Sequence, residues 1–89
     1  MQTLILPGRR LASQNALHDW LDEAVGLPYY GRNLDTLWDL SSATIPLPMT
    51  LIWQDFAQSR VLIGDYANKT QQVFQEAADL RQGFYFQVQ

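Results

Sequence analysis

Three short apolar runs, spaced far apart along the chain, constrain the fold most. They occupy residues 3–6, 49–53 and 84–88. Each is short and largely aliphatic or aromatic, as is typical of a strand buried by helices that cover the sheet. The stretches between them have helical periodicity, and strands that alternate with helices favour crossover connections and parallel pairing. The runs therefore predict an α/β fold with a three-stranded parallel sheet packed by about four helices.

The predicted helices have recognisable beginnings and ends. Ser13 is a favourable N-cap for the first helix, and Gly26 is a favourable residue just past its end. Asn33 caps a second helix that runs to about residue 42. The third covers residues 55–63 and the fourth residues 66–81. No linker or internal repeat interrupts this series, so we expect one domain over residues 1–89.

The first and last predicted helices are amphipathic. The residues expected to face the core are Leu17, Trp20, Leu21 and Ala24 in the first, and Val73, Phe74, Ala77 and Leu80 in the last. His18 is the only histidine, and Asp22 lies four residues further along the same helix. We expect these two to form an exposed ion pair or hydrogen bond.

Composition narrows the classes of function. The net charge is −3, so the chain lacks the basic surface that nucleic-acid binding requires. The sequence has no cysteine, and a single histidine leaves too few ligands for a metal site. No cofactor motif is present, and neither a signal peptide nor a membrane-spanning segment is recognisable. We expect a cytoplasmic protein that binds no nucleic acid, membrane, metal or cofactor.

The most informative stretch is residues 27–40, LPYYGRNLDTLWDL. At about 100° per residue, Leu34, Leu37 and Trp38 share the core-facing side of the second helix. Several polar or aromatic residues gather on the flank beside Trp38 or just before the helix: Tyr29, Tyr30, Asn33, Asp35, Asp39 and Ser42. The stretch therefore predicts one surface patch that combines carboxylates with phenol rings, an amide and a hydroxyl.

Asp39 has the weakest structural explanation among these residues. Asn33 serves as a cap, and Asp35 is favoured by the dipole at the start of the helix. Asp39 lies too far along to benefit, and aspartate is a poor residue in a helix interior. At about 6 Å in water, its repulsion from Asp35 is about 0.7 kcal/mol. Because Arg32 is the only cation close by in sequence, we expect a partner to supply positive charge.

Catalysis by the same carboxylates is the alternative. A glycosidase-type acid–base pair must face each other across about 5–10 Å. Side chains on one helix point the same way, so Asp35 and Asp39 could not flank a substrate, and a residue such as Glu76 would have to take the second role. We expect no enzymatic activity.

The stretch 27–40 resembles the signature of the barstar family, intracellular inhibitors of barnase-type ribonucleases. The resemblance extends over nearly the whole chain, including residues 46–59 and 72–77. It implies a two-layer α/β fold with a three-stranded parallel sheet. It also implies a mechanism in which the second helix and the preceding loop enter the active site of a basic, extracellular-type ribonuclease, one inhibitor to one enzyme.

The resemblance also assigns roles by matching positions. Asp39 would take the place of an RNA phosphate, beside Asp35, and Tyr29 would cover the catalytic histidine of the enzyme. The full set of implied partner-binding residues is Tyr29, Tyr30, Asn33, Asp35, Trp38, Asp39, Ser42 and Glu76.

Two departures from the family pattern concern the rim of this surface. Arg32 is positive where well-known members carry an acid, and Thr44 stands where some members have tryptophan. They leave the choice of cognate enzyme open. The alternative is an interaction or immunity module of the same fold that binds a different basic protein or toxin and inhibits no ribonuclease.

Overall fold

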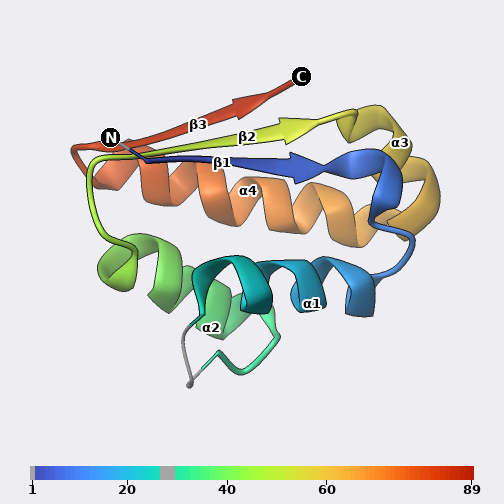
Figure 1. Cartoon of the computed structure of the whole chain (residues 1–89), viewed down its shortest axis with the longest axis horizontal. Coiled ribbons are helices and arrows are strands. Elements are labelled where there is room, and N and C mark those ends of the chain that lie inside the picture. The colour runs from blue at the N-terminus through green and yellow to red at the C-terminus, as the bar shows by residue number, and fades with distance from the viewer. Residues whose placement is uncertain (1, 27–29) are drawn as a thin grey trace.

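A three-stranded parallel sheet with helices on one side forms the fold (Figure 1). The computed structural model describes residues 2–26 and 30–89. The strands are β1 (Gln2–Pro7), β2 (Met49–Gln54) and β3 (Phe84–Val88), in the order β1-β2-β3 with both pairs parallel. The predicted α/β class and parallel sheet are confirmed.

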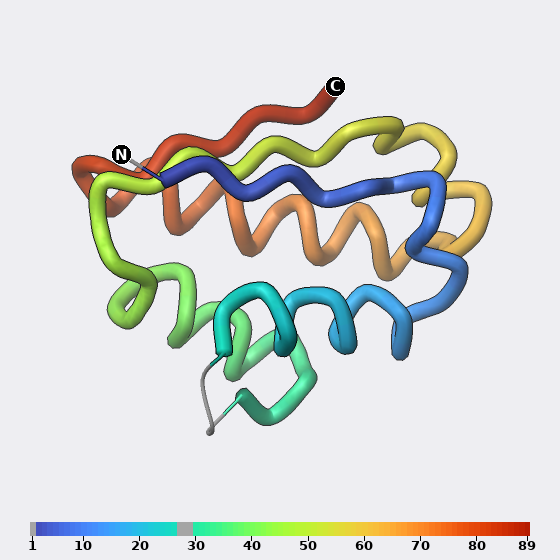
Figure 2. The backbone as a smooth tube through the Cα atoms, viewed as in Figure 1, coloured from blue at the N-terminus to red at the C-terminus, as the bar shows by residue number. Residues whose placement is uncertain are grey.

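Four α-helices connect the strands: α1 (Gln14–Val25), α2 (Leu34–Asp39), α3 (Phe56–Ile63) and α4 (Asp65–Leu80). A 3₁₀ turn, η1 (Gly8–Arg10), follows β1, and a π-helical turn, η2 (Leu40–Thr44), continues directly from α2. Figure 2 shows that the strands all run in one direction and that α1 and α4 return in the other. This is the crossover connection that parallel strands require.

The predicted helix boundaries rest on local capping, and the structure contains those caps. Ser13 Oγ accepts a hydrogen bond from the amide of Ala16 at 3.1 Å. Gly26 has φ +68°, a left-handed conformation that glycine adopts without the strain of a Cβ. The Asn33 side chain accepts from the amide of Thr36 at 2.8 Å, and Thr36 Oγ1 accepts from the amide of Asn33 at 3.3 Å. This reciprocal capping box fixes the start of α2.

The core lies between the sheet and the helices. Aligned residues of the strands supply one side, since Leu6 pairs with Trp53, and Leu51 lies between Leu4 and Phe86. Leu17 and Leu21 of α1, Leu37 and Leu40 near α2, and Phe74 and Ala77 of α4 are buried against it. Packing against this apolar core therefore fixes the position of α2 relative to the sheet.

Two expected core positions are wrong. Leu80 is 75% exposed, and Ala24 is also exposed. The buried positions of α4 run from Ala67 through Phe74 to Ala77. The next position on that face is Arg81, whose side chain is half-buried and donates to the carbonyl of Ser41 at 3.2 Å. Leu80 therefore points away from the core at the end of the helix.

In the described part of the chain, no helix has the length and apolar character needed to cross a membrane.

Candidate functional site

The two carboxylates of α2 lie on the exposed side of a well-anchored helix. Leu37 is fully buried and Trp38 is half-buried against the core, whereas Asp35 and Asp39 are exposed. Helix α2 packs against α4, and Figure 1 shows it on the side of α4 away from the sheet. The helical arrangement therefore presents both acids to solvent and directs the neighbouring apolar side chains inward.

Neither acid is neutralised from within the described structure. In residues 2–26 and 30–89, no arginine or lysine nitrogen lies within 4.0 Å of the carboxylate oxygens of Asp35 or Asp39. Arg32 forms an ion pair with Asp19 of α1 and lies 3.8 Å from a carboxylate oxygen of Asp22. Arg32, the cation nearest in sequence, is thus paired with acids of α1, and Asp35 and Asp39 remain available to a cation from a partner.

The other predicted site residues have different degrees of exposure. Asn33 is exposed, although its side chain is engaged in the cap of α2. Tyr30 is half-buried, and its hydroxyl contacts His18. Ser42 is half-buried in the π-helical turn, in which the amide of Ile45 donates to the carbonyl of Leu40 at 2.9 Å. Tyr29 lies outside the described residues.

Glu76 comes from a separate element. It is exposed on α4 and accepts a hydrogen bond from Gln72 Nε2 at 3.2 Å. Helix α4 packs against both α2 and η2. The fold therefore brings the helix that carries Glu76 beside the elements that carry Asp35, Asp39 and Ser42.

His18 is buried, and the predicted exposed pair with Asp22 is wrong. The histidine is 1% exposed, and its Nδ1 lies against the hydroxyl of Tyr30. Its Nε2 lies 2.7 Å from the hydroxyl of Tyr66, in the first turn of α4. Asp22 lies near Arg32 instead. The sequence spacing could have predicted this burial, because His18 lies on the same face of the helix as Leu17 and Leu21.

Burial and a nearby cation favour the neutral form of the His18 imidazole. Desolvation is the main cause that lowers its pKa from the usual 6.5, and the positive charge of Arg32 adds to it, while Asp19 opposes both. Burial also raises the pKa of the Tyr30 and Tyr66 hydroxyls. These shifts favour the uncharged form of all three groups at neutral pH, so that each hydrogen bond joins a neutral donor to a neutral acceptor.

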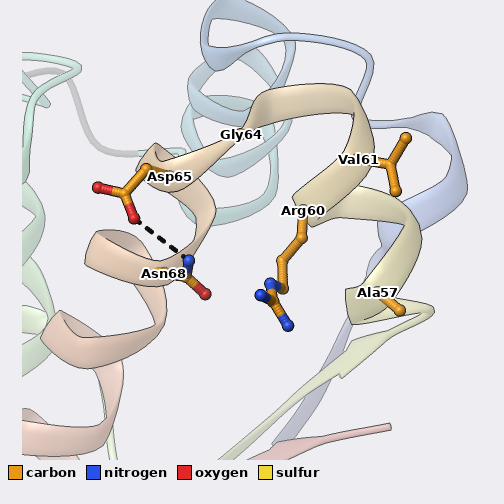
Figure 3. A pocket seen from close by; sticks show the side chains of 6 residues that line it. All are labelled: Ala57, Arg60, Val61, Gly64, Asp65 and Asn68. Atoms are coloured by element: carbon orange, nitrogen blue, oxygen red, sulfur yellow. Dashed lines mark hydrogen bonds between the residues drawn. The ribbon is translucent and has the colours of Figure 1, made fainter.

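A groove of about 410 Å³ lies between α3 and α4. Its lining, drawn in Figure 3, comprises Ala57, Arg60, Val61, Gly64, Asp65 and Asn68. Within it, Asn68 Nδ2 donates to Asp65 Oδ1 at 3.3 Å. The groove contains none of the predicted site residues, and Figure 1 places α3 at the other end of the molecule from η2. Across the described residues, no cluster of three or more histidine, aspartate or glutamate side chains could hold a metal ion.

Comparison with known proteins agrees with the sequence resemblance. The family described as "Barstar (barnase inhibitor)" matches residues 1–89. A Bacillus subtilis (strain 168) protein named "Putative ribonuclease inhibitor YrdF" is 40% identical over 80 residues, which cover 89% of this chain and 88% of that protein.

Proposed function

Because this chain belongs to the barstar family, we propose that it inhibits a barnase-like ribonuclease by placing the acidic side of α2 in the enzyme's active site. The family is one of inhibitors and not of enzymes, so the chain needs binding residues and no catalytic ones. In the proposed complex Asp39 occupies the position of an RNA phosphate, and one inhibitor binds one enzyme. The cytoplasm is its proposed compartment.

The observation that carries this proposal is the pair of exposed acids without an internal cation. In the described structure Asp35 and Asp39 face solvent on a helix whose opposite side is buried, while Arg32 is held by α1. Carboxylates form strong, often bidentate hydrogen bonds with guanidinium groups, as phosphates do. A ribonuclease pocket that binds phosphate therefore offers the charge that this surface lacks.

The remaining residues would complete the contact around Asp39. Asn33 and Trp38 flank it on α2, Ser42 follows at the far end, and Glu76 adds a carboxylate from α4. Tyr29 and Tyr30 contribute aromatic rings before the helix. Opposite net charges would speed the encounter and make it sensitive to salt. Inhibition then requires only that the inhibitor fill the space that RNA must enter.

The test compares two variants that each remove one negative charge. Asp39→Ala should raise the inhibition constant against barnase at least about 100-fold. In the proposed complex Asp39 forms a buried ion pair, and removing one partner of such a pair costs about 3–5 kcal/mol. Asp65→Ala should change it by less than about threefold, because Asp65 is exposed in the groove between α3 and α4, which contains none of the predicted site residues. RNA cleavage at fixed enzyme and increasing inhibitor gives both constants.

Three results would contradict the proposal. Equal inhibition by wild type and Asp39→Ala would remove the phosphate-mimic role of Asp39. An equal loss in both variants would show that only net charge matters. A wild-type protein that binds a basic toxin but inhibits no barnase-like ribonuclease would favour the alternative interaction module.

A further inference from the structure

A hydrogen-bonded chain centred on the buried side chain of His18 joins the loop before α2 to the rest of the fold. It runs from the hydroxyl of Tyr30, through the imidazole of His18 in α1, to the hydroxyl of Tyr66 in α4, where the His18–Tyr66 distance is 2.7 Å. The ring centroid of His18 lies 5.6 Å from that of each tyrosine. Three elements that are distant in sequence therefore meet at one side chain.

The same part of α1 makes a second contact with the loop, through acidic side chains that face Arg32. Asp19 forms an ion pair with Arg32, and Asp22 lies 3.8 Å from it. Arg32 has φ +60°, a left-handed conformation that is strained for a residue with a Cβ. The loop residues on either side of Gly31 are thus both attached to α1, and the second attachment is made by the residue whose backbone is strained.

We infer that His18 and Tyr66 are positioning residues that hold the segment from Tyr30 to Asn33 in the conformation needed for ribonuclease binding. This inference rests on the proposed function, because it concerns the same binding surface. Neither residue needs to touch the enzyme, because the Tyr66 hydroxyl holds the His18 ring in place and that ring in turn holds the Tyr30 hydroxyl.

The hydrogen-bonding capacity of the three groups suits this role. A neutral imidazole has one donor and one acceptor, and a tyrosine hydroxyl can act as either. Both imidazole nitrogens of His18 are therefore satisfied only while both tyrosines are in place. Removing the Tyr66 hydroxyl leaves one buried nitrogen without a partner, which weakens the attachment of the ring that holds Tyr30.

A fixed loop improves affinity because less conformational freedom is lost on binding. The capping box of α2 follows Tyr30 by three residues, so movement of the tyrosine would also shift the start of the helix that carries Asp35 and Asp39. The chain through His18 is therefore placed to affect the binding surface and not only global stability.

The experiment compares Tyr66→Phe with a matched control, Ser59→Ala. Ser59 Oγ is also buried in a two-bond chain, accepting from Trp53 Nε1 at 2.8 Å and donating to the carbonyl of Gly8 at 3.0 Å. Its helix, α3, lies at the end of the molecule opposite η2 (Figure 1). Each variant removes one hydroxyl that is hydrogen-bonded to a fully buried side chain, His18 or Trp53, so the resulting loss of global stability is similar in kind.

Two measurements separate positioning from stability. In the free protein, the hydrogen-bonded amides of Asn33, Thr36 and Leu37 should exchange with solvent faster in Tyr66→Phe than in Ser59→Ala. In binding, Tyr66→Phe should raise the Kd for barnase about tenfold, and Ser59→Ala should leave it within about twofold. In a Tyr30→Phe background, Tyr66→Phe should cause little further loss of affinity.

Each contrary outcome has a definite meaning. Equal exchange in the two variants, or a Tyr66→Phe effect on Kd that persists in full without the Tyr30 hydroxyl, would overturn the positioning role. If the wild type binds no ribonuclease, the proposed function fails, and amide exchange in the free protein still decides whether the chain holds the loop.

Discussion

Asn33 combines two roles in one side chain. Its amide oxygen caps α2 by accepting from the amide of Thr36, and the residue is exposed within the proposed contact surface. A cap acts on the stability of the free protein, whereas a contact acts only in the complex. Substitution can therefore separate the two roles.

Asn33→Ala should lower the free energy of unfolding by about 1 kcal/mol, because it removes the N-cap of a short helix. Asn33→Ser should keep most of that stability, since serine is also a good cap. If Asn33 contacts the ribonuclease, both variants should bind more weakly than wild type. Urea unfolding and binding titrations measure the two effects, and full affinity in Asn33→Ser would show that capping is the only role.

At the scale of elements, one connection depends on a glycine without a Cβ. A Cβ on Gly8 would lie 2.1 Å from the carbonyl oxygen of Gln54 and 2.6 Å from that of Asp55. Both are backbone atoms, so a rearrangement of η1 against the end of β2 would be needed to accommodate it. Gly26 differs, because its φ is +68° but no neighbouring atom lies within 4 Å of an added Cβ.

Gly8→Ala should therefore destabilise the protein by at least about 2 kcal/mol, through overpacking of a closed site. Gly26→Ala should cost about 1 kcal/mol, from the left-handed backbone alone. Thermal or urea unfolding of the two variants gives the comparison. A Gly8→Ala protein as stable as Gly26→Ala would mean that η1 and β2 can separate more easily than the structure indicates.

The elements themselves follow from local sequence signals. The caps at Ser13 and Asn33 and the glycine after α1 depend on neighbouring residues only, so the amino-acid sequence is enough to predict them. The buried face of α4 is harder to predict, because Leu80 follows the apolar pattern although the helix ends there. The burial of such a terminal residue depends on what the next element covers.

At the scale of the whole molecule, some features of the site follow from local sequence, and others depend on tertiary contacts. The acidic run of α2 is local and is recognisable from spacing and family resemblance. The chain through His18 joins residues 12 and 48 positions away in sequence, and no local pattern specifies such contacts. The pairing of Arg32 with α1 is also a tertiary contact, so the sequence alone predicts only that its charge lies near the acidic residues of α2.

The buried histidine predicts how stability depends on pH. Its pKa in the folded protein lies below the usual 6.5, so the unfolded chain takes up a proton first as the pH falls. The free energy of unfolding should therefore be greatest above pH 6.5 and decrease below it, by at most about 1.4 kcal/mol per pH unit from this group. The decrease continues until the folded-state pKa of His18 is reached.

Because His18 is the only histidine, its ring proton resonances report this titration without assignment from variants. Nuclear magnetic resonance should show a midpoint below 6.5 in the folded protein. Urea unfolding at a series of pH values should show the matching loss of stability. A midpoint at or above 6.5 would contradict the buried, neutral histidine and with it the physical basis of the loop attachment.

The central claim, that the acidic side of α2 occupies the phosphate site of a ribonuclease, is tested most directly by competition. A dinucleotide analogue that barnase binds but cannot cleave should displace this protein from the enzyme. The apparent Kd of the complex should rise in proportion to analogue concentration once the phosphate site fills. An apparent Kd that does not change at saturating analogue would show that both ligands bind together, and would contradict the account.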